Sequence, residues 1–201
     1  MTTYSMPSAP GFSSASFGLR SNTQTFTSPL TGKLQVIELT GARWYASYTL
    51  PPLTEAEAGE WIAFLTKLRG QANSFFAHDP ARTTAQGTPT GTPLVNGAGQ
   101  TGTNLITDGW TASTLVLKAG DYISVAATQS KLFMVVDDAV SNAGGQVTLI
   151  IEPGIKTSPA DGAEIKISTP TCVMRLDGSD VTWNISVLKH LGISFSATET
   201  L

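Results

Sequence analysis

A single stretch of this chain has the apolar spacing of an amphipathic helix, and that limits the fold more than any other feature of its 201 residues. Residues 54–69 begin at Thr54, and Glu57 follows three positions later, which is the spacing of a capping box. The apolar stripe of this segment comprises Ala58, Trp61, Ile62, Phe64, Leu65 and Leu68. Because one helix cannot bury the apolar residues of so long a chain, we expect a mainly β fold with this helix packed on a sheet.

Strand patterns occupy much of the remaining chain. Apolar and polar side chains alternate in residues 44–50 and 181–187, which is the period of a strand with one face in a core. We therefore expect Trp44 and Trp183 to be core residues, together with Trp61 of the helix. Further strand candidates are residues 33–39, 73–78, 114–117, 122–125, 131–136, 146–152, 164–167, 172–176 and 193–197.

The two ends of the chain carry weaker signals. Residues 1–20 are rich in Ser, Pro and Gly with isolated aromatic residues, which predicts an extended arm or a first edge strand. An extended arm of this length could reach a neighbouring molecule, since each residue spans at most ~3.3–3.6 Å. Near the other end, Asp177-Gly178 predicts a hairpin turn that joins strands 172–176 and 181–187.

The strand candidates divide the chain into two groups. Residues 82–104 are dominated by Thr, Gly, Pro and Asn, which predicts a polar linker or long loop. The strands that follow, up to residue 165, are short and regularly spaced, as in a small antiparallel barrel or sandwich. We therefore expect 82–165 to be an inserted barrel-like domain. Residues 1–81 and 166–201 would together form a β-sandwich that carries the helix.

Composition excludes several function classes. Charged residues are 13% of the chain, the net charge is −3, and no Lys/Arg cluster occurs, so we expect no nucleic-acid recognition. The one cysteine, Cys172, permits no intrachain disulfide, and its apolar neighbours predict a buried side chain. No apolar run approaches the ~20 residues of a membrane span, and the N-terminus lacks the pattern of a secretory signal.

The sequence GAGQTG at 97–102 fits the G-x-G-x-x-G pattern of dinucleotide-binding loops. That chemistry needs a preceding buried strand and a following helix whose N-terminus receives the phosphates. Residues 93–96 are too short and polar for the strand, and the segment after Gly102 has no helical period. We therefore interpret Asn96-Gly97 as a turn in a loop and expect no nucleotide cofactor.

No catalytic or metal-binding constellation is evident. His78 and His190 lie far apart without the spacing of a zinc hydrolase motif. Asp137-Asp138 could bind Ca²⁺ or act in glycoside cleavage, but adjacent strand residues point to opposite faces, which favours a solvated strand end. No G-x-S-x-G motif occurs. We expect a protein that is not an enzyme and binds no metal.

Trp110 is the one tryptophan in a loop-like context, Asp108-Gly109-Trp110. An exposed indole there could stack on a sugar or pack on a neighbouring subunit. It could equally cap the small barrel of its own chain. Trp110 is therefore the candidate contact residue for a glycan or a subunit.

The order of segments resembles the minor tail proteins of long, non-contractile-tailed bacteriophages, in particular the distal tail protein class. The resemblance covers most of the chain and rests on the succession RWYASYTLPPLT, EAEAGEWIAFLTKLRGQ, SFFAHDP, TLVLKAGDYISV, LFMVVDDAVSNAGGQVTLIIEPGI, CVMRLDG, VTW and GISFSATET. It implies a β-sandwich with a packed helix and a second, barrel-like domain that is inserted or appended.

The same resemblance implies a function. Proteins of this class are structural virion components, without catalytic residues or cofactors, that form a ring of about six copies. The ring joins the tail tube protein to the tail hub protein, with tape-measure and receptor-binding proteins as further partners. The expected location is the tail tip of the virion, after assembly in the bacterial cytoplasm. The alternatives are a carbohydrate-binding module of the tail tip, or a tail tube, terminator or hub protein. Hydroxyl-rich strand edges with little charge suit contact between copies, because few charges would lose water there.

Overall fold

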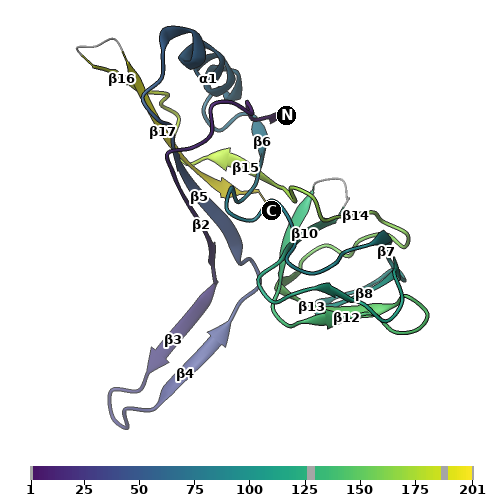
Figure 1. The fold of residues 1–201 in the computed structure, drawn as a ribbon. Coiled ribbons are helices and arrows are strands. Elements are labelled where there is room, and N and C mark those ends of the chain that lie inside the picture. Colours follow the sequence, from purple (N-terminus) through teal and green to yellow (C-terminus); the bar gives the residue numbers. More distant parts are fainter. Residues whose placement is uncertain (1, 126–129, 187–189, 201) are drawn as a thin grey trace.

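The computed structural model describes residues 2–125, 130–186 and 190–200, and it shows a mainly β protein with one helix (Figure 1). The expected fold class is confirmed: a sheet carries the helix, and a second, barrel-like antiparallel sheet follows. Two separate hydrophobic cores lie in these two units.

The first sheet has seven strands in the order β1-β6-β15-β17-β5-β2, with β16 paired to β17. Its strands are β1 (Thr3–Ser5), β2 (Ser14–Arg20), β5 (Arg43–Thr49), β6 (Ser74–Ala77), β15 (Cys172–Leu176), β16 (Trp183–Ile185) and β17 (Leu191–Glu199). All pairs are antiparallel except β1 with β6. The inward positions of β5 alternate as the sequence predicted, with Trp44, Ala46 and Tyr48 buried.

Helix α1 (Glu55–Leu68) covers one face of this sheet (Figure 1). The predicted capping box is confirmed, because the backbone N–H of Thr54 donates to the Glu57 carboxylate at 2.9 Å. Trp61 packs against Phe195 of β17, and Phe64 packs edge-on against Phe75 of β6. Among the described residues, no helix is long and apolar enough to span a membrane.

The second sheet has six strands in the order β14-β10-β11-β13-β8-β7. Its strands are β7 (Gly91–Val95), β8 (Gly102–Trp110), β10 (Tyr122–Val125), β11 (Lys131–Val135), β13 (Val147–Ile155) and β14 (Ile165–Lys166). A bridge between Leu94 and Glu164 joins the two outer strands, so the sheet nearly closes into a barrel. A small ladder of β9 (Leu115–Leu117) with β12 (Ala139–Val140) completes this unit.

The predicted linker 82–104 is only partly correct. Residues 91–95 form strand β7, and β8 begins at Gly102. The strand signal was weak because β7 buries only alternate residues, Pro93 and Val95, and because it is an outer strand.

The strands of the first sheet come from residues 3–77 and 172–199, and those of the second from 91–166. The two units are in contact: Tyr122 and Leu132, from the second sheet, belong to the first hydrophobic core. That residues 82–165 form an inserted domain, whose removal leaves a folded remainder, stays a prediction.

Of the two expectations about the chain ends, one is confirmed in one of its alternatives and the other is wrong. Residues 1–20 form edge strands and not a detached arm, because β1 and β2 are the outer strands of the first sheet and the Trp61 indole N–H donates to the carbonyl of Ala9 at 3.2 Å. Asp177-Gly178, by contrast, does not join a hairpin. Strand β15 pairs with β6 and β17, and β16 lies on a different stretch of β17.

Candidate functional site

A two-stranded hairpin leaves the body of the protein and forms its most exposed apolar surface. We call residues 21–42, which contain β3 (Thr23–Thr27) and β4 (Leu34–Glu38), the arm. Within the described chain β3 and β4 pair only with each other, and Figure 1 shows them projecting away from both sheets. Every residue of both strands is exposed.

The arm carries apolar side chains on both of its faces. The register pairs Thr25 with Val36 and Thr27 with Leu34, so these four side chains share one face. The other face carries Phe26, which is 64% exposed, beside its cross-strand neighbours. Leu30 at the tip is 95% exposed. The large apolar side chains that the arm exposes are Phe26, Leu30, Leu34, Val36, Ile37 and Leu39.

This surface is at the upper end of what a monomeric protein usually exposes. Six of the twelve strongly exposed large apolar side chains among the described residues lie in the arm. At roughly 150–200 Å² for each fully exposed side chain, these six expose on the order of 600 Å². Typical monomers keep their largest apolar patch at about 300–600 Å². An isolated two-stranded hairpin is also only marginally stable in water, which makes the arm a candidate contact surface.

The base of the arm fixes its direction. Strands β2 and β5 pair up to Arg20 and Arg43, and the arm continues the same ribbon. At the junction, the backbone N–H of Leu39 donates to the carbonyl of Asn22 at 2.8 Å, and the Asn22 side-chain amide donates to Thr40 at 2.9 Å. The arm is thus an extension of the ribbon, held by hydrogen bonds at its root.

A second exposed apolar surface lies at the opposite end of the first sheet. Trp183 is 43% exposed and Ile185 is 67% exposed, both on β16. The expectation that Trp183 is a core residue is therefore wrong. The alternation of 181–187 did indicate a strand, but β16 pairs only with β17 at the end of the sheet, and no described element covers its apolar face.

A notch lies beside this second surface. It has a volume of about 190 Å³ and lies where β17 has no strand partner on one side, between its pairing with β15 and its pairing with β16. Its apolar lining comes from Leu65 of α1, Leu176 of β15, Val181 and Phe195. Its polar lining comes from Asp180, Thr182, Ser194 and Ser196. We call this cavity the notch.

The candidate contact residue Trp110 is buried in the structure. Only 5% of its surface is exposed, and its indole N–H donates to the hydroxyl of Thr107 at 2.8 Å. Its backbone N–H donates to the carbonyl of Gly145 at 3.1 Å. An indole held in this way has no open face to stack on a sugar or a subunit. Trp110 therefore caps its own barrel, which was one of the three alternatives.

The GAGQTG segment forms the connection between β7 and β8, with no helix behind it. The side chain of Gln100 fills the loop, donating to the carbonyls of Asn96 and Gly97 and accepting the N–H of Ile106 at 2.7 Å. The N–H of Gly97 donates to the carboxylate of Asp161 at 2.7 Å. A carboxylate at that position would repel a phosphate, so this loop is not shaped for a nucleotide.

The titratable residues named from the sequence do not converge. Within residues 2–125, 130–186 and 190–200, no group of three or more His, Cys, Asp or Glu side chains could hold a metal ion. His78 is partly buried, which lowers the pKa of its imidazole. Asp137 is exposed, and Asp138 accepts the backbone N–H of Ala119 at 2.9 Å. Cys172 is buried, and that burial raises the pKa of its thiol well above the usual value.

One carboxylate that sequence analysis did not single out, Asp121, has a structural role. It is buried and accepts the backbone N–H groups of Gln86 at 2.8 Å, Gly87 at 3.3 Å and Lys118 at 2.8 Å. Gly87 passes so close to Val116 that a Cβ atom at position 87 would lie 2.3 Å from its carbonyl oxygen. Asp121 thus fastens the segment before β7 to the barrel.

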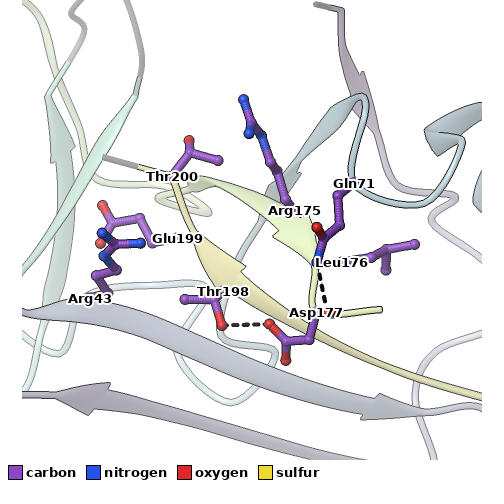
Figure 2. A pocket seen from close by; sticks show the side chains of 8 residues that line it. All are labelled: Arg43, Gln71, Arg175, Leu176, Asp177, Thr198, Glu199 and Thr200. Atoms are coloured by element: carbon purple, nitrogen blue, oxygen red, sulfur yellow. Dashed lines mark hydrogen bonds between the residues drawn. The ribbon is translucent and has the colours of Figure 1, made fainter. Parts of the chain in front are cut away.

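A charged hollow of about 430 Å³ lies between the ends of β5, β15 and β17. Figure 2 shows the side chains that line it. The hydroxyl of Thr198 donates to the Asp177 carboxylate at 2.6 Å, and the Gln71 amide donates to the Asp177 carbonyl at 2.8 Å. The buried Glu199 carboxylate accepts the backbone N–H of Trp44 at 3.2 Å and forms an ion pair with Lys156 at 3.6 Å. Of these contacts, the ion pair with Lys156 joins the two units, and the others lie within the first unit.

Lys156 links the barrel to the root of the arm. Its ammonium donates to the carbonyl of Ala42 and pairs with Glu199. Burial lowers the pKa of Lys156, and the neighbouring carboxylate opposes that effect. Residue 42 precedes β5, so this contact helps to hold the arm's base against the second unit.

A scan against models of protein families finds none that matches this chain, and a search of curated proteins finds no match either.

Proposed function

We propose that this chain is a structural protein of a phage tail tip, which forms a ring between the tail tube and the central hub. The sequence resemblance to distal tail proteins supports this proposal. A β-rich fold with one packed helix and a barrel-like second unit is compatible with it.

The observation that carries the proposal is the arm. A chain that exposes on the order of 600 Å² of apolar side chains on one projecting hairpin gains by burying them against another molecule. A standard interface buries about 800 Å² on each partner, so the arm could supply most of one side. Sparse charge lowers the cost of such contacts, because few ions have to lose their water.

In this proposal the chain acts by shape and contact rather than by turnover. Its partners are further copies of itself, the tail tube and hub proteins, and the tape-measure and receptor-binding proteins. It is located at the tail tip of the virion after assembly in the bacterial host. Because Trp110 is buried, the alternative role in glycan binding has no candidate contact residue.

Electron microscopy of the purified chain, alone and mixed with tail tubes, tests the proposal. We expect closed rings of about six copies, and rings seated at one end of the tubes in the mixture. Particles of a single chain that leave the tube ends bare would contradict it.

A further inference from the structure

The two exposed apolar surfaces lie at opposite ends of the same strand pair. Strands β5 and β17 pair from Tyr45 with Thr198 to Thr49 with Ser194. Beyond the Tyr45 end the ribbon runs into the arm, and beyond the Thr49 end β17 continues into its pairing with β16. Figure 1 shows the arm and the β16–β17 end pointing in different directions. The arm of one molecule therefore cannot reach the notch of the same molecule.

The notch is large enough to hold one apolar side chain. Its volume of about 190 Å³ exceeds the ~150 Å³ of an apolar cavity that holds a benzene ring. Its walls are apolar at Leu65, Leu176, Val181 and Phe195, and polar at Asp180, Thr182, Ser194 and Ser196. Leu30 is the most exposed of the arm's apolar side chains, and it lies on the loop 28–33 between β3 and β4.

The charges nearby are complementary. Lys33 and Glu38 are the only charged residues of the arm, and Lys33 lies at its tip, three positions from Leu30. Asp180 lines the notch. A tip seated in the notch would bring an ammonium towards a carboxylate, whereas two arms packed tip to tip would bring two ammonium groups together.

We propose that the tip of the arm docks in the notch of a second copy of this chain, with Leu30 in the cavity and Lys33 facing Asp180. The arm tip and the notch are different surfaces of one chain, so the contact between two copies is head to tail. Repeating that contact with a rotation that closes on itself gives a ring. This inference rests on the proposed function, since it names the joint between neighbouring copies of that ring. It leaves the β16 face, with Trp183 and Ile185, beside the arm of the incoming copy.

Disulfide trapping of the purified full chain tests the joint. On mild oxidation, the variant Leu30→Cys/Val181→Cys should form disulfide-linked multimers, which appear as a ladder of bands on a non-reducing gel. The matched control Leu30→Cys/Ala143→Cys places the second thiol on an exposed loop of the barrel unit, and it should give at least about tenfold less multimer. The native Cys172 is buried, so the unaltered chain should give none.

Charge reversal gives a second measurement. Lys33→Asp should weaken self-association about two- to fivefold, and Lys33→Asp/Asp180→Lys should restore it. Restoration is expected only if the two residues face each other between copies.

Sizing of the same samples separates the two proposals. Multimers of native size without cross-links between positions 30 and 181 would overturn the notch as the acceptor and leave the ring intact, with the arm covered by another surface or a tail partner. Covalent dimers from Leu30→Cys alone, at the yield of the double variant, would show tip-to-tip packing and also overturn it. A single-chain mass at every concentration would contradict the ring and the joint together.

Discussion

The indole N–H of Trp44 donates to the backbone carbonyl of Leu132 at 2.9 Å, across 88 positions of sequence. Trp44 lies on β5 of the first sheet and Leu132 on β11 of the second, and both are buried. The bond therefore ties the unit that carries the arm to the barrel. Tyr122 packs edge-on against the same indole, with ring centroids 5.4 Å apart.

Replacing Trp44 by Phe should destabilise the whole chain. The change removes the donor and leaves a buried carbonyl without it, which costs about 1–3 kcal/mol of unfolding free energy. Chemical denaturation followed by circular dichroism measures this loss. Trp183→Phe is the matched control, because that indole is 43% exposed, and its cost should stay below about 0.5 kcal/mol. Equal losses for the two variants would contradict the role given to Trp44.

Asp121→Ala should destabilise the barrel unit. Three backbone N–H groups would lose their shared acceptor, at a cost of about 2–4 kcal/mol. Hydrogen exchange should then show faster exchange at Gln86, Gly87 and Lys118 than in the native chain. Asp137→Ala, at an exposed position, serves as the control and should leave the exchange of these amides unchanged. If these three amides exchanged as slowly in Asp121→Ala as in the native chain, the role given to Asp121 would be wrong.

The helix cap should contribute to stability in a pH-dependent way. The backbone N–H of Thr54, and then its hydroxyl, lower the pKa of the Glu57 carboxyl below its ordinary value. A carboxyl with a lowered pKa in the folded state stabilises the fold above its unfolded-state pKa, and this contribution is lost as the pH falls through the folded-state pKa. The stability difference between the native chain and Glu57→Gln should therefore be constant at neutral pH and shrink below about pH 4.5.

Thermal unfolding of both proteins at a series of pH values measures that difference. The Gln side chain keeps the length and a neutral acceptor, so the comparison isolates the charge. A difference that stays constant through the acid range, or grows there, would show that the capping carboxylate does not titrate in this way.

Replacing residues 86–165 by a short linker should leave a folded remainder. The seven-stranded sheet and α1 lie outside the deleted segment, so the hydrogen bonds between the strands of that sheet are retained. The remainder should be less stable than the full chain, because Trp44 loses its acceptor and the first core loses Tyr122 and Leu132. A cooperative unfolding transition at lower denaturant concentration is the expected result. Loss of cooperativity would count against two separable units.

Sequence analysis could predict the elements but not what covers them. The helix, its cap and most strands follow from local periodicity and from turn residues, and the structure has them within a few positions. The strand predicted at 181–187 corresponds to β16, Trp183–Ile185, with residue 187 outside the described residues, and the strand predicted at 33–39 corresponds to β4, Leu34–Glu38. A period of two marks an apolar face, however, and does not say whether that face meets the same chain or another molecule.

The sequence patterns therefore did not identify the arm as a candidate site. The signal that could have found the arm is the isolation of its apolar run 34–39: apart from Phe26 and Leu30, segments 21–32 and 40–42 contain mostly polar and small residues, so they offer no second apolar strand to pack on. Trp110 was expected in a loop but is buried, because Asp108-Gly109 has the composition of a turn although both residues lie within β8. Asp121 could not be found from sequence, since two of its three donors lie 34 and 35 positions away.

The central claim is that this chain assembles through its exposed arm, and the molar mass in solution tests it most directly. Light scattering coupled to size exclusion should give the native chain a mass of about six copies, and the variant Phe26→Ser/Leu30→Ser/Val36→Ser the mass of one copy. The control Ile106→Ser/Val140→Ser removes exposed apolar side chains from the barrel unit and should keep the native mass. A native chain that stays single at every concentration, or an arm variant that keeps the native multimer, would contradict the account.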